Sequence, residues 1–583
     1  MRRLKPLFWA LLVGAMLLVG AIVVGLPFAG CGKRVSVPPV PRRPHATATQ
    51  AAAPMLAALP ADTAARKEPD PRVFHRSLTE PEFLDPGMCS ESEGGAVLGD
   101  TFEGLFVYGP DHRDVRPGAA TSIDVTPDGK TYTFHLRPGA LWSDGVPVTA
   151  DDFVWSWKRV MDPAFGSRNA DFLSPIEGAL AYAHSGKASE KARAALRDAV
   201  GVNAPDTQTL VVRLTAPTPY FKATTAFYTL LPVPRHVVEG ASPGPGGKPW
   251  TRPGEMVSNG PWTLAEWRSR ERIVLTRNDR YWDAAHTPFD RVVYHIAETD
   301  EPLHNMYLAG ELDYLQGHVP TSVLPTYLKE KRPDLVVSPH LAVYYYIFNV
   351  ERPPFNDVRV RKALNLAIDK RELGAFVLKG GQEAATSIVP PTIREIGYTP
   401  AQGPQADPEA ARVLLADAGY PGGRGFPHIE IAYNTNEGNQ RVAEFVQQQW
   451  KRALGVDASL ENMEWKVLLK RQAAHDYGII RSAWIGDYVD PLTFLDLWES
   501  RNPNNQSGYA RPEYDRLIDR VRHEPDVTQR FGLLRQAEEM FLTDMPGLPL
   551  YFYVKFDLVQ PWVKGFSPHL QDVHPSRYFR VER

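Results

Sequence analysis

An export-type N-terminus combined with almost no cysteine constrains this chain more than any other feature. Basic residues within positions 2–5 precede an uncharged, mostly apolar run over residues 7–28, and small residues then lead to Cys31, which is the order typical of a secretory signal. Cys89 is the only other cysteine. If Cys31 carries a lipid, the exported body has no intramolecular disulfide and must be stabilised by packing. Its 583 residues are too many for one hydrophobic core, so we expect two or three domains.

The position of Cys31, directly after Ala29 and Gly30, resembles the lipobox of bacterial lipoproteins, where the cysteine becomes the acylated first residue. The resemblance implies a lipoprotein-type signal segment over residues 1–31, with Cys31 as the lipidation site. The apolar run is also long enough to span a bilayer uncut, so an N-terminal helical anchor is the alternative. Residues 32–72, rich in Pro, Ala and Thr, predict a disordered tether. Either anchor holds the protein at the periplasmic or extracellular face of a membrane.

Charge and motif content favour a binding protein. The net charge of −3, with no basic stripe, argues against nucleic-acid binding. The 16 histidines include no His-Glu-x-x-His pair, and neither a phosphate-binding loop nor a dinucleotide fingerprint is present. Residues 240–244 match the Gly-x-Ser-x-Gly pattern of a nucleophile elbow in residue type. The context does not fit, because Pro243 follows the serine and the sequence predicts neither a strand before it nor a helix after it. We therefore expect no enzyme, no cofactor and no metal site.

Local patterns predict short strands mixed with helices, hence an α/β fold. Tyr132, Phe134 and Leu136 alternate as in a half-buried strand. Ala150 opens a segment with acidic residues in its first turn, which is typical of a helix start. The other expected elements are helices after Asp357 and Asp407, the first with the stripe Val360, Leu364, Ala367 and Ile368, and a strand through Ile429, Ile431 and Tyr433.

A set of segments in fixed order carries a family resemblance. They are residues 128–137 with 142–145, 258–262, 277–282, 344–346 with 353–361, 464–466 and 551–553. Together they resemble the bacterial oligopeptide-binding proteins, the peptide receptors of ABC importers. The matches run in the order of that family from about residue 73 to the C-terminus.

The resemblance implies a two-lobed, periplasmic-binding-protein-like α/β fold with an extra domain and a hinged cleft between the lobes. Closure of such a cleft encloses the ligand. The expected boundaries are 73–102, 235–340 and 556–583 for a discontinuous lobe I, 103–234 for the additional domain, and 341–555 for lobe II.

The resemblance also implies a ligand site around the segment 481–488. Asp487 would pair with the free α-ammonium group of a peptide, because an ammonium group taken out of water needs a carboxylate partner. The structural alternative for a lone Asp-Tyr pair is a loop or a helix cap. Other expected contacts, to side chains or backbone, are Asn439, Trp465, Arg481, Ala483, Trp484, Ile485 and Tyr553.

Several positions depart from the family pattern. Ile485 stands where cysteine is frequent, and Asn439 replaces a histidine that helps to receive the carboxylate of a short peptide. A family arginine falls on Gln472, a family lysine on Leu378, and an aromatic pocket residue on Asn169. The amine end is kept and the carboxylate end is altered, so the preferred peptide length stays open.

The function implied is an extracytoplasmic receptor, expected to be a monomer, that captures short peptides and delivers them to an ABC permease. We expect the peptide to lie extended and to add its backbone to strand edges. The alternatives are a lipid-anchored peptide sensor that feeds no importer, or a binder of murein peptides, dipeptides or metal chelates. A peptide-processing enzyme is a third class.

Overall fold

The computed structural model describes residues 70–110, 115–218, 220–240 and 249–582. The predicted signal segment and Cys31 lie outside the described residues, as do nearly all of the predicted tether and most of the match at 240–244. Among the described helices, none is both long and apolar enough to cross a bilayer.

One large mixed sheet organises the described residues. Its strands are β1 (Val73–Leu78), β8 (Trp262–Arg268), β9 (Arg272–Arg277), β10 (Arg291–Ile296), β11 (Tyr314–Gln316), β12 (Leu335–Phe348), β13 (Glu383–Ala384), β14 (Ile429–Asn434), β15 (Ala458–Met463), β16 (Ile479–Ile485) and β17 (Gly547–Val559). They follow the order β15-β14-β16-β12-β17-β11-β1-β10-β9-β8, with β13 paired to β17.

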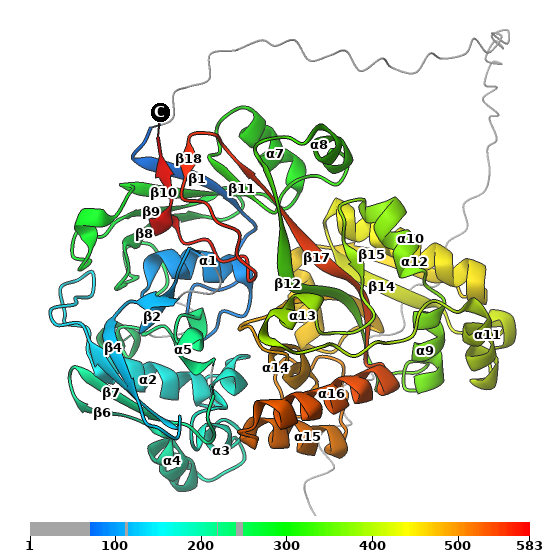
Figure 1. Ribbon diagram of the computed structural model, residues 1–583, viewed down its shortest axis with the longest axis horizontal. Coiled ribbons are helices and arrows are strands. Elements are labelled where there is room, and N and C mark those ends of the chain that lie inside the picture. Colours follow the sequence, from blue (N-terminus) through cyan, green and yellow to red (C-terminus); the bar gives the residue numbers. More distant parts are fainter. Residues whose placement is uncertain (1–69, 111–114, 219, 241–248, 583) are drawn as a thin grey trace, which may run out of the picture. The chain divides into compact units, whose positions relative to one another are not determined.

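Two long strands, β12 and β17, join the two ends of this sheet and lie side by side in Figure 1. Their antiparallel register breaks between Pro339 and Val343 of β12, where the ladder passes from Val554 to Phe552 of β17. On the side of the break that contains Pro339, β17 also pairs with β11. On the side that contains Val343, β12 also pairs with β16. Because such a β-bulge bends a strand pair and re-aims side chains, the bend falls between the two ends of the sheet.

Separate hydrophobic cores cover these two ends. The first core includes Phe74 of β1 and Phe579 near the end of the chain. At the other end β12 is buried on both faces: Tyr345 lies in a second core and Tyr344 in a third. The unbroken apolar run at 341–348 follows from this, because a strand that is covered on both faces does not alternate with polar residues. The protein is thus a two-lobed α/β protein.

The helices begin where local signals predict. The carboxylates of Asp357 and Asp407 accept hydrogen bonds from backbone N–H groups at the starts of α9 and α11. Ala367 and Ile368 follow the end of α9, because Asp369 caps the next short helix, but both stay buried. The helices of nine or more residues are α1 (Ser92–Thr101), α2 (Ala150–Met161), α4 (Glu190–Ala199), α7 (Asp300–Leu308), α9 (Val358–Leu366), α11 (Pro408–Asp417), α12 (Glu437–Leu454), α13 (Trp465–Ala473), α15 (Pro512–His523) and α16 (Val527–Asp544).

A smaller antiparallel sheet lies within the predicted additional domain. Its strands are β4 (Ala120–Val125), β5 (Thr131–Leu136), β6 (Val202–Asp206) and β7 (Thr209–Arg213), in the order β4-β5-β7-β6. Tyr132, Phe134 and Leu136 of β5 are buried in alternation, which confirms the predicted half-buried strand. The lobe boundaries expected from the sequence stay a prediction.

Candidate functional site

A cavity of about 560 Å³ lies between residues of the first core and residues of the second and third cores. Its volume is in the range of sites that enclose small ligands. α1 and β2 (Phe106–Tyr108) contribute to one side of the wall, and β12, β16 and β17 contribute to the other. All eight sequence-predicted contacts line it: Asn439, Trp465, Arg481, Ala483, Trp484, Ile485, Asp487 and Tyr553.

β16 brings four of these eight residues together, and Asp487 follows it directly after Gly486. Its sequence is β-branched and aromatic, and Gly478 and Gly486 bracket it, which explains why a strand forms here and where it ends. One edge of β16 pairs with β12 along its whole length. The other edge pairs with β14 only at Ile479 and Ile480. Within the described residues, this outer edge has no strand partner from Arg481 onward.

Main-chain groups on that open edge of β16 form part of the cavity wall. The side chain of Gln472 donates a hydrogen bond to the carbonyl of Arg481 at 2.9 Å, so that carbonyl points away from β12. Because strand geometry repeats every two residues, the main-chain groups of Ala483 and Ile485 point to the same edge. Both residues line the cavity.

Asp487 follows β16, and side chains fix its backbone. Its N–H donates to Oγ1 of Thr493 at 3.0 Å, and its carbonyl accepts from Nε2 of Gln571 at 2.6 Å. No cation of the described residues pairs with its carboxylate. Burial, and then the nearby carboxylate of Asp496, raise the pKa of Asp487 well above its ordinary value. The side chain is thus suited to a cation that the described chain does not supply.

Arg481 is a partly buried cation held by aromatic residues. Its Nη2 donates to the hydroxyl of Tyr553 at 2.9 Å, and its guanidinium carbon lies 4.9 Å from the ring centre of Tyr344. Its Nε is buried without a hydrogen-bond partner among the described residues. Tyrosines rather than carboxylates surround it, so it keeps its capacity to bind an acceptor group from a ligand.

Two tryptophans add unpaired donors to the wall. The Nε1 atoms of Trp465 and Trp484 are buried and have no acceptor within the described part of the chain. Asn439 is less free, because its Nδ2 donates to the backbone carbonyl and to Oδ1 of Asn434 at 3.2 and 2.9 Å. Wall aromatics with an open N–H group suit a ligand that carries carbonyl oxygens.

The positions that depart from the family pattern divide into two groups. Gln472 and Leu378 line the cavity. Asn169 does not: its Nδ2 donates to the carbonyl of Cys89 at 3.0 Å, behind the wall.

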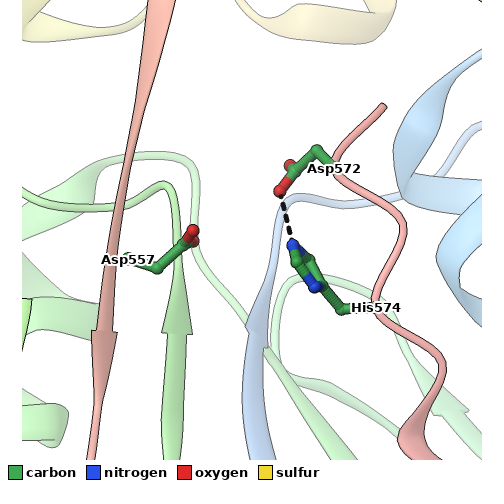
Figure 2. A group of neighbouring side chains, drawn as sticks. All are labelled: Asp557, Asp572 and His574. Carbon is green, nitrogen blue, oxygen red and sulfur yellow. Dashed lines mark hydrogen bonds and ion pairs between the residues drawn. The ribbon is translucent and has the colours of Figure 1, made fainter. Parts of the chain in front are cut away.

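A second carboxylate of the wall, Asp572, is fully paired. It forms an ion pair with Nζ of Lys555 and a hydrogen bond with Nε2 of His574 at 3.1 Å. Figure 2 shows Asp572 and His574 joined in this way, with Asp557 of β17 nearby; one ligand atom of each lies within 4.8 Å of the others. Burial pushes the pKa of Asp572 upward, but Lys555 and His574 outweigh it and hold that pKa well below its ordinary value. Lys555 thus already supplies the positive charge that balances Asp572.

Sequence reasoning missed several polar residues of the wall. His340 sits at the register break of β12, and both its ring nitrogens are buried without a partner among the described residues. Burial lowers the pKa of His340 to about 3, so the ring is neutral. Tyr108, Gln571 and Asp572 also line the cavity. None belongs to a motif, and Gln571 is 84 positions from the residue whose carbonyl it binds, so no local signal marks it.

Comparisons with known proteins match most of the chain. The family model described as "Bacterial extracellular solute-binding proteins, family 5 Middle" matches residues 114–506. Oligopeptide-binding protein OppA of Bacillus subtilis (strain 168) is 37% identical over 486 residues, which cover 82% of this chain and 86% of that protein. The structure of Haemophilus influenzae OppA in complex with RPPGFSPFR is 32% identical and covers 88% of this chain and 100% of that chain, with a TM-score of 0.82.

A further structure is informative about the arrangement of the lobes. The unliganded open form of the murein tripeptide-binding protein MppA of Escherichia coli is 34% identical over 88% of this chain and 98% of that chain, yet its TM-score is 0.59. The present structure therefore resembles the peptide complex more than the open form.

Proposed function

Because the chain belongs to family 5 of the bacterial extracellular solute-binding proteins, we propose that Asp487 receives the free amino terminus of a short peptide in the cavity. Members of this family are binding proteins, and the chain is a receptor that captures short peptides for an ABC importer. One observation carries the role of Asp487: a partly buried carboxylate without a cation partner among the described residues lines the cavity. A ligand ammonium group would supply that missing charge.

The peptide backbone would lie along the open edge of β16. Main-chain groups of Ala483 and Ile485 point to that edge, and an extended peptide can pair with them as an added strand. Such hydrogen bonds are the same for every peptide sequence, so they give affinity without selecting side chains. Asp487, just beyond the end of β16, would set the register of the peptide.

The side chains of the peptide would meet the aromatic part of the wall. Trp465 and Trp484 offer flat apolar faces together with an unpaired N–H group each. Arg481 would bind a carboxylate or a carbonyl oxygen of the ligand. Water that fills the rest of the cavity can rearrange its hydrogen bonds, which would let varied side chains enter.

Delivery would take place outside the cytoplasm. Relatives of the chain are periplasmic or extracellular binding proteins. Lipid on Cys31 would tether the body to the membrane, and a permease would recognise the loaded form of the monomer. Radiolabelled palmitate in cells producing the full chain would test the anchor, with a Cys31→Ala variant as the control that should carry no label.

A binding experiment tests the amine anchor. Calorimetry would compare a pool of unblocked tripeptides with the same pool after N-acetylation. We expect acetylation to weaken binding by about 2–5 kcal/mol, because it removes the charge that pairs with Asp487. Equal affinity for the two pools would remove Asp487 from the site and leave only a general solute receptor. Native mass spectrometry of the purified protein would identify any retained peptide.

A further inference from the structure

The end of the chain passes from one core into another and back. Val563 and Phe579 are buried in the first core, whereas Leu570, between them, is buried in the second core. The carbonyl of Leu570 also accepts the N–H of Leu341 at 2.7 Å. Residues 570–574, which we call the C-terminal strap, therefore connect the two ends of the main sheet without being part of it.

One side of the C-terminal strap is pinned to the first-core end of the sheet. Arg76 of β1 donates to the carbonyl of His574 at 2.8 Å, and Nε2 of Gln316 of β11 donates to the carbonyl of Asp572 at 3.0 Å. The Asp572 side chain adds the ion pair with Lys555 and the bond to His574 that Figure 2 shows. Asp572 has a φ of 57°, a left-handed conformation that aspartate tolerates better than most residues. These contacts fix the shape of the strap.

The other side of the strap reaches the candidate ligand site through Gln571. Nε2 of Gln571 donates to the backbone carbonyl of Asp487 at 2.6 Å. The same side chain lies close enough to Tyr108 of β2 to influence the pKa of its hydroxyl, and Phe106 of that strand lies in the first core. Gln571 is only 7% exposed, so its amide is enclosed between Tyr108 and the Asp487 carbonyl that it binds. One side chain thus joins the wall of the first-core end to the backbone of Asp487.

These contacts belong to an arrangement that resembles a peptide complex, with TM-scores of 0.82 against that complex and 0.59 against an unliganded open form. A bond present in only one of two arrangements shifts their populations by its own free energy. The strap is pinned on the first-core side, whereas Asp487 follows β16 at the other end of the sheet. Separation of the two ends while the strap keeps its first-core contacts would therefore break the bond between Gln571 and Asp487, together with that between Leu570 and Leu341.

We propose that Gln571 is a positioning residue that aims Asp487 into the cavity and couples capture of the ligand's amino group to closure of the lobes. The inference rests on the proposed role of Asp487 and deepens it. Asp487 holds the ligand through its carboxylate and the strap through its carbonyl. Ligand binding and closure therefore stabilise each other through one residue.

A matched pair of variants tests this inference. Gln571→Met keeps length and volume but removes the donor to Asp487. The control is Gln560→Met: Gln560 is also buried in the last part of the chain, and its Nε2 donates to the carbonyls of Tyr307 and Leu312 at 2.8 and 3.3 Å, away from the cavity wall. Calorimetry on the full chain in detergent would use the unblocked and the N-acetylated tripeptide pools, and small-angle X-ray scattering would report closure.

We expect Gln571→Met to lower the affinity for the unblocked pool about fivefold, which corresponds to about 1 kcal/mol. Its affinity for the acetylated pool should fall less, because acetylated peptides do not use the Asp487 carboxylate and lose only the contribution of Gln571 to closure. The unblocked pool should compact the variant less than the wild type. Gln560→Met should bind both pools as the wild type does, even if it unfolds at a lower temperature.

Three results would overturn the inference. Wild-type affinity and compaction in Gln571→Met would do so, as would an equal loss for both pools. If the wild type itself shows no preference for the unblocked pool, the role of Asp487 and this inference fail together. If Asp487→Asn removes that preference while Gln571→Met keeps wild-type binding, only the inference about Gln571 fails.

Discussion

Two carboxylates in the wall of one cavity, Asp572 and Asp487, have opposite electrostatic surroundings. Asp572 has Lys555 and His574 as partners, and its pKa is held well below the ordinary value. Asp487 has no cation partner among the described residues, and burial raises its pKa. Both line the cavity, so position alone does not separate them. The partners of each carboxylate indicate which one belongs to the fold and which one is available to a ligand.

The same contrast holds for two arginines of the wall. Arg577 forms an ion pair with Glu103 at 3.2 Å, whereas Arg481 contacts the hydroxyl and ring of tyrosines. Arg577 therefore stabilises the first-core end of the sheet. Arg481, like Asp487, is a charged group whose strongest partner is absent from the described chain.

The largest expected effect is on stability, in Asp572→Ala. Removing this carboxylate takes away the ion-pair partner of the mostly buried Lys555 ammonium group and leaves it only the weaker interaction with Asp557. The loss should therefore approach about 3–5 kcal/mol, which is typical of a broken buried pair. Urea unfolding would measure the loss, with Asp487→Ala as the control that should unfold at the wild-type urea concentration or above it. Equal loss in the two variants would contradict the contrast between the two carboxylates.

Peptide affinity should depend more on Asp487 than on Asp572, the reverse of the order for stability. Asp487→Ala removes the proposed partner of the ligand ammonium and should weaken binding of unblocked tripeptides by about 2–5 kcal/mol. Calorimetry with the unblocked pool would measure this. Tyr108→Phe, which keeps the ring beside Asp487 but removes its hydroxyl, is a control expected to lose less. Wild-type affinity in Asp487→Ala would show that Asp487, like Asp572, serves the fold.

Parts of the fold could be predicted from short local patterns, whereas the candidate ligand site was implied by the family resemblance. The alternation in β5 and the caps at Asp357 and Asp407 are local and proved correct. Residues 481–485 belong to β16, and Asp487 follows it. The candidate residues of this one segment therefore line the same cavity. Their contacts with a ligand stay a prediction.

The paired charges of the wall could not be predicted, because their partners are distant in the sequence or in unremarkable segments. His340 reaches the cavity through a register break in β12, which no residue pattern announces. Gln571 and Asp572 belong to a segment whose shape depends on Arg76 and Gln316, far earlier in the chain. Such positions follow from tertiary packing rather than from local preference.

The pH dependence of binding should distinguish the two carboxylates further. The raised pKa of Asp487 means that the free protein holds the carboxyl proton at pH values where an ordinary aspartate is charged. A ligand ammonium group favours the charged form, so binding should release a proton and affinity should rise with pH, by at most about tenfold per pH unit. Affinity should fall again above about pH 8, where the α-amino group of the peptide loses its charge. Asp496, whose pKa burial raises to about 8, lies near the same carboxylate and would add to this effect. Tyr108, Tyr228 and Tyr488 also lie near it, but burial raises the pKa of each hydroxyl, so all three stay neutral in this pH range.

Calorimetry in two buffers of different ionisation enthalpy would count the released protons. In Asp487→Asn the release should fall to the smaller part that Asp496, whose pKa burial raises to about 8, contributes. In Asp572→Asn it should persist, because the lowered pKa of Asp572 means that this carboxyl is already charged. For the same reason, the stability that Asp572 contributes is present above the ordinary aspartate pKa of 3.8 and should be lost as the pH falls below it. Proton release that stays at the wild-type level in Asp487→Asn would assign the titration to another group.

The smallest expected effect concerns how firmly Asp487 is held. Thr493 is 2% exposed, and its Oγ1 accepts the N–H of Asp487 at 3.0 Å, so Thr493→Val keeps the shape but leaves that N–H group without an acceptor. We expect affinity for unblocked tripeptides to fall about fivefold, the effect of one neutral hydrogen bond. Thr224→Val is the matched control, because Thr224 is also buried and its hydroxyl donates to the carbonyl of Phe221 at 2.7 Å, away from the cavity. If both variants lose stability but only Thr493→Val loses affinity, the backbone bond to Thr493 positions Asp487 for a ligand, much as Lys555 and His574 position Asp572. If neither loses affinity, Asp487 needs no such support and the contrast lies in charge alone.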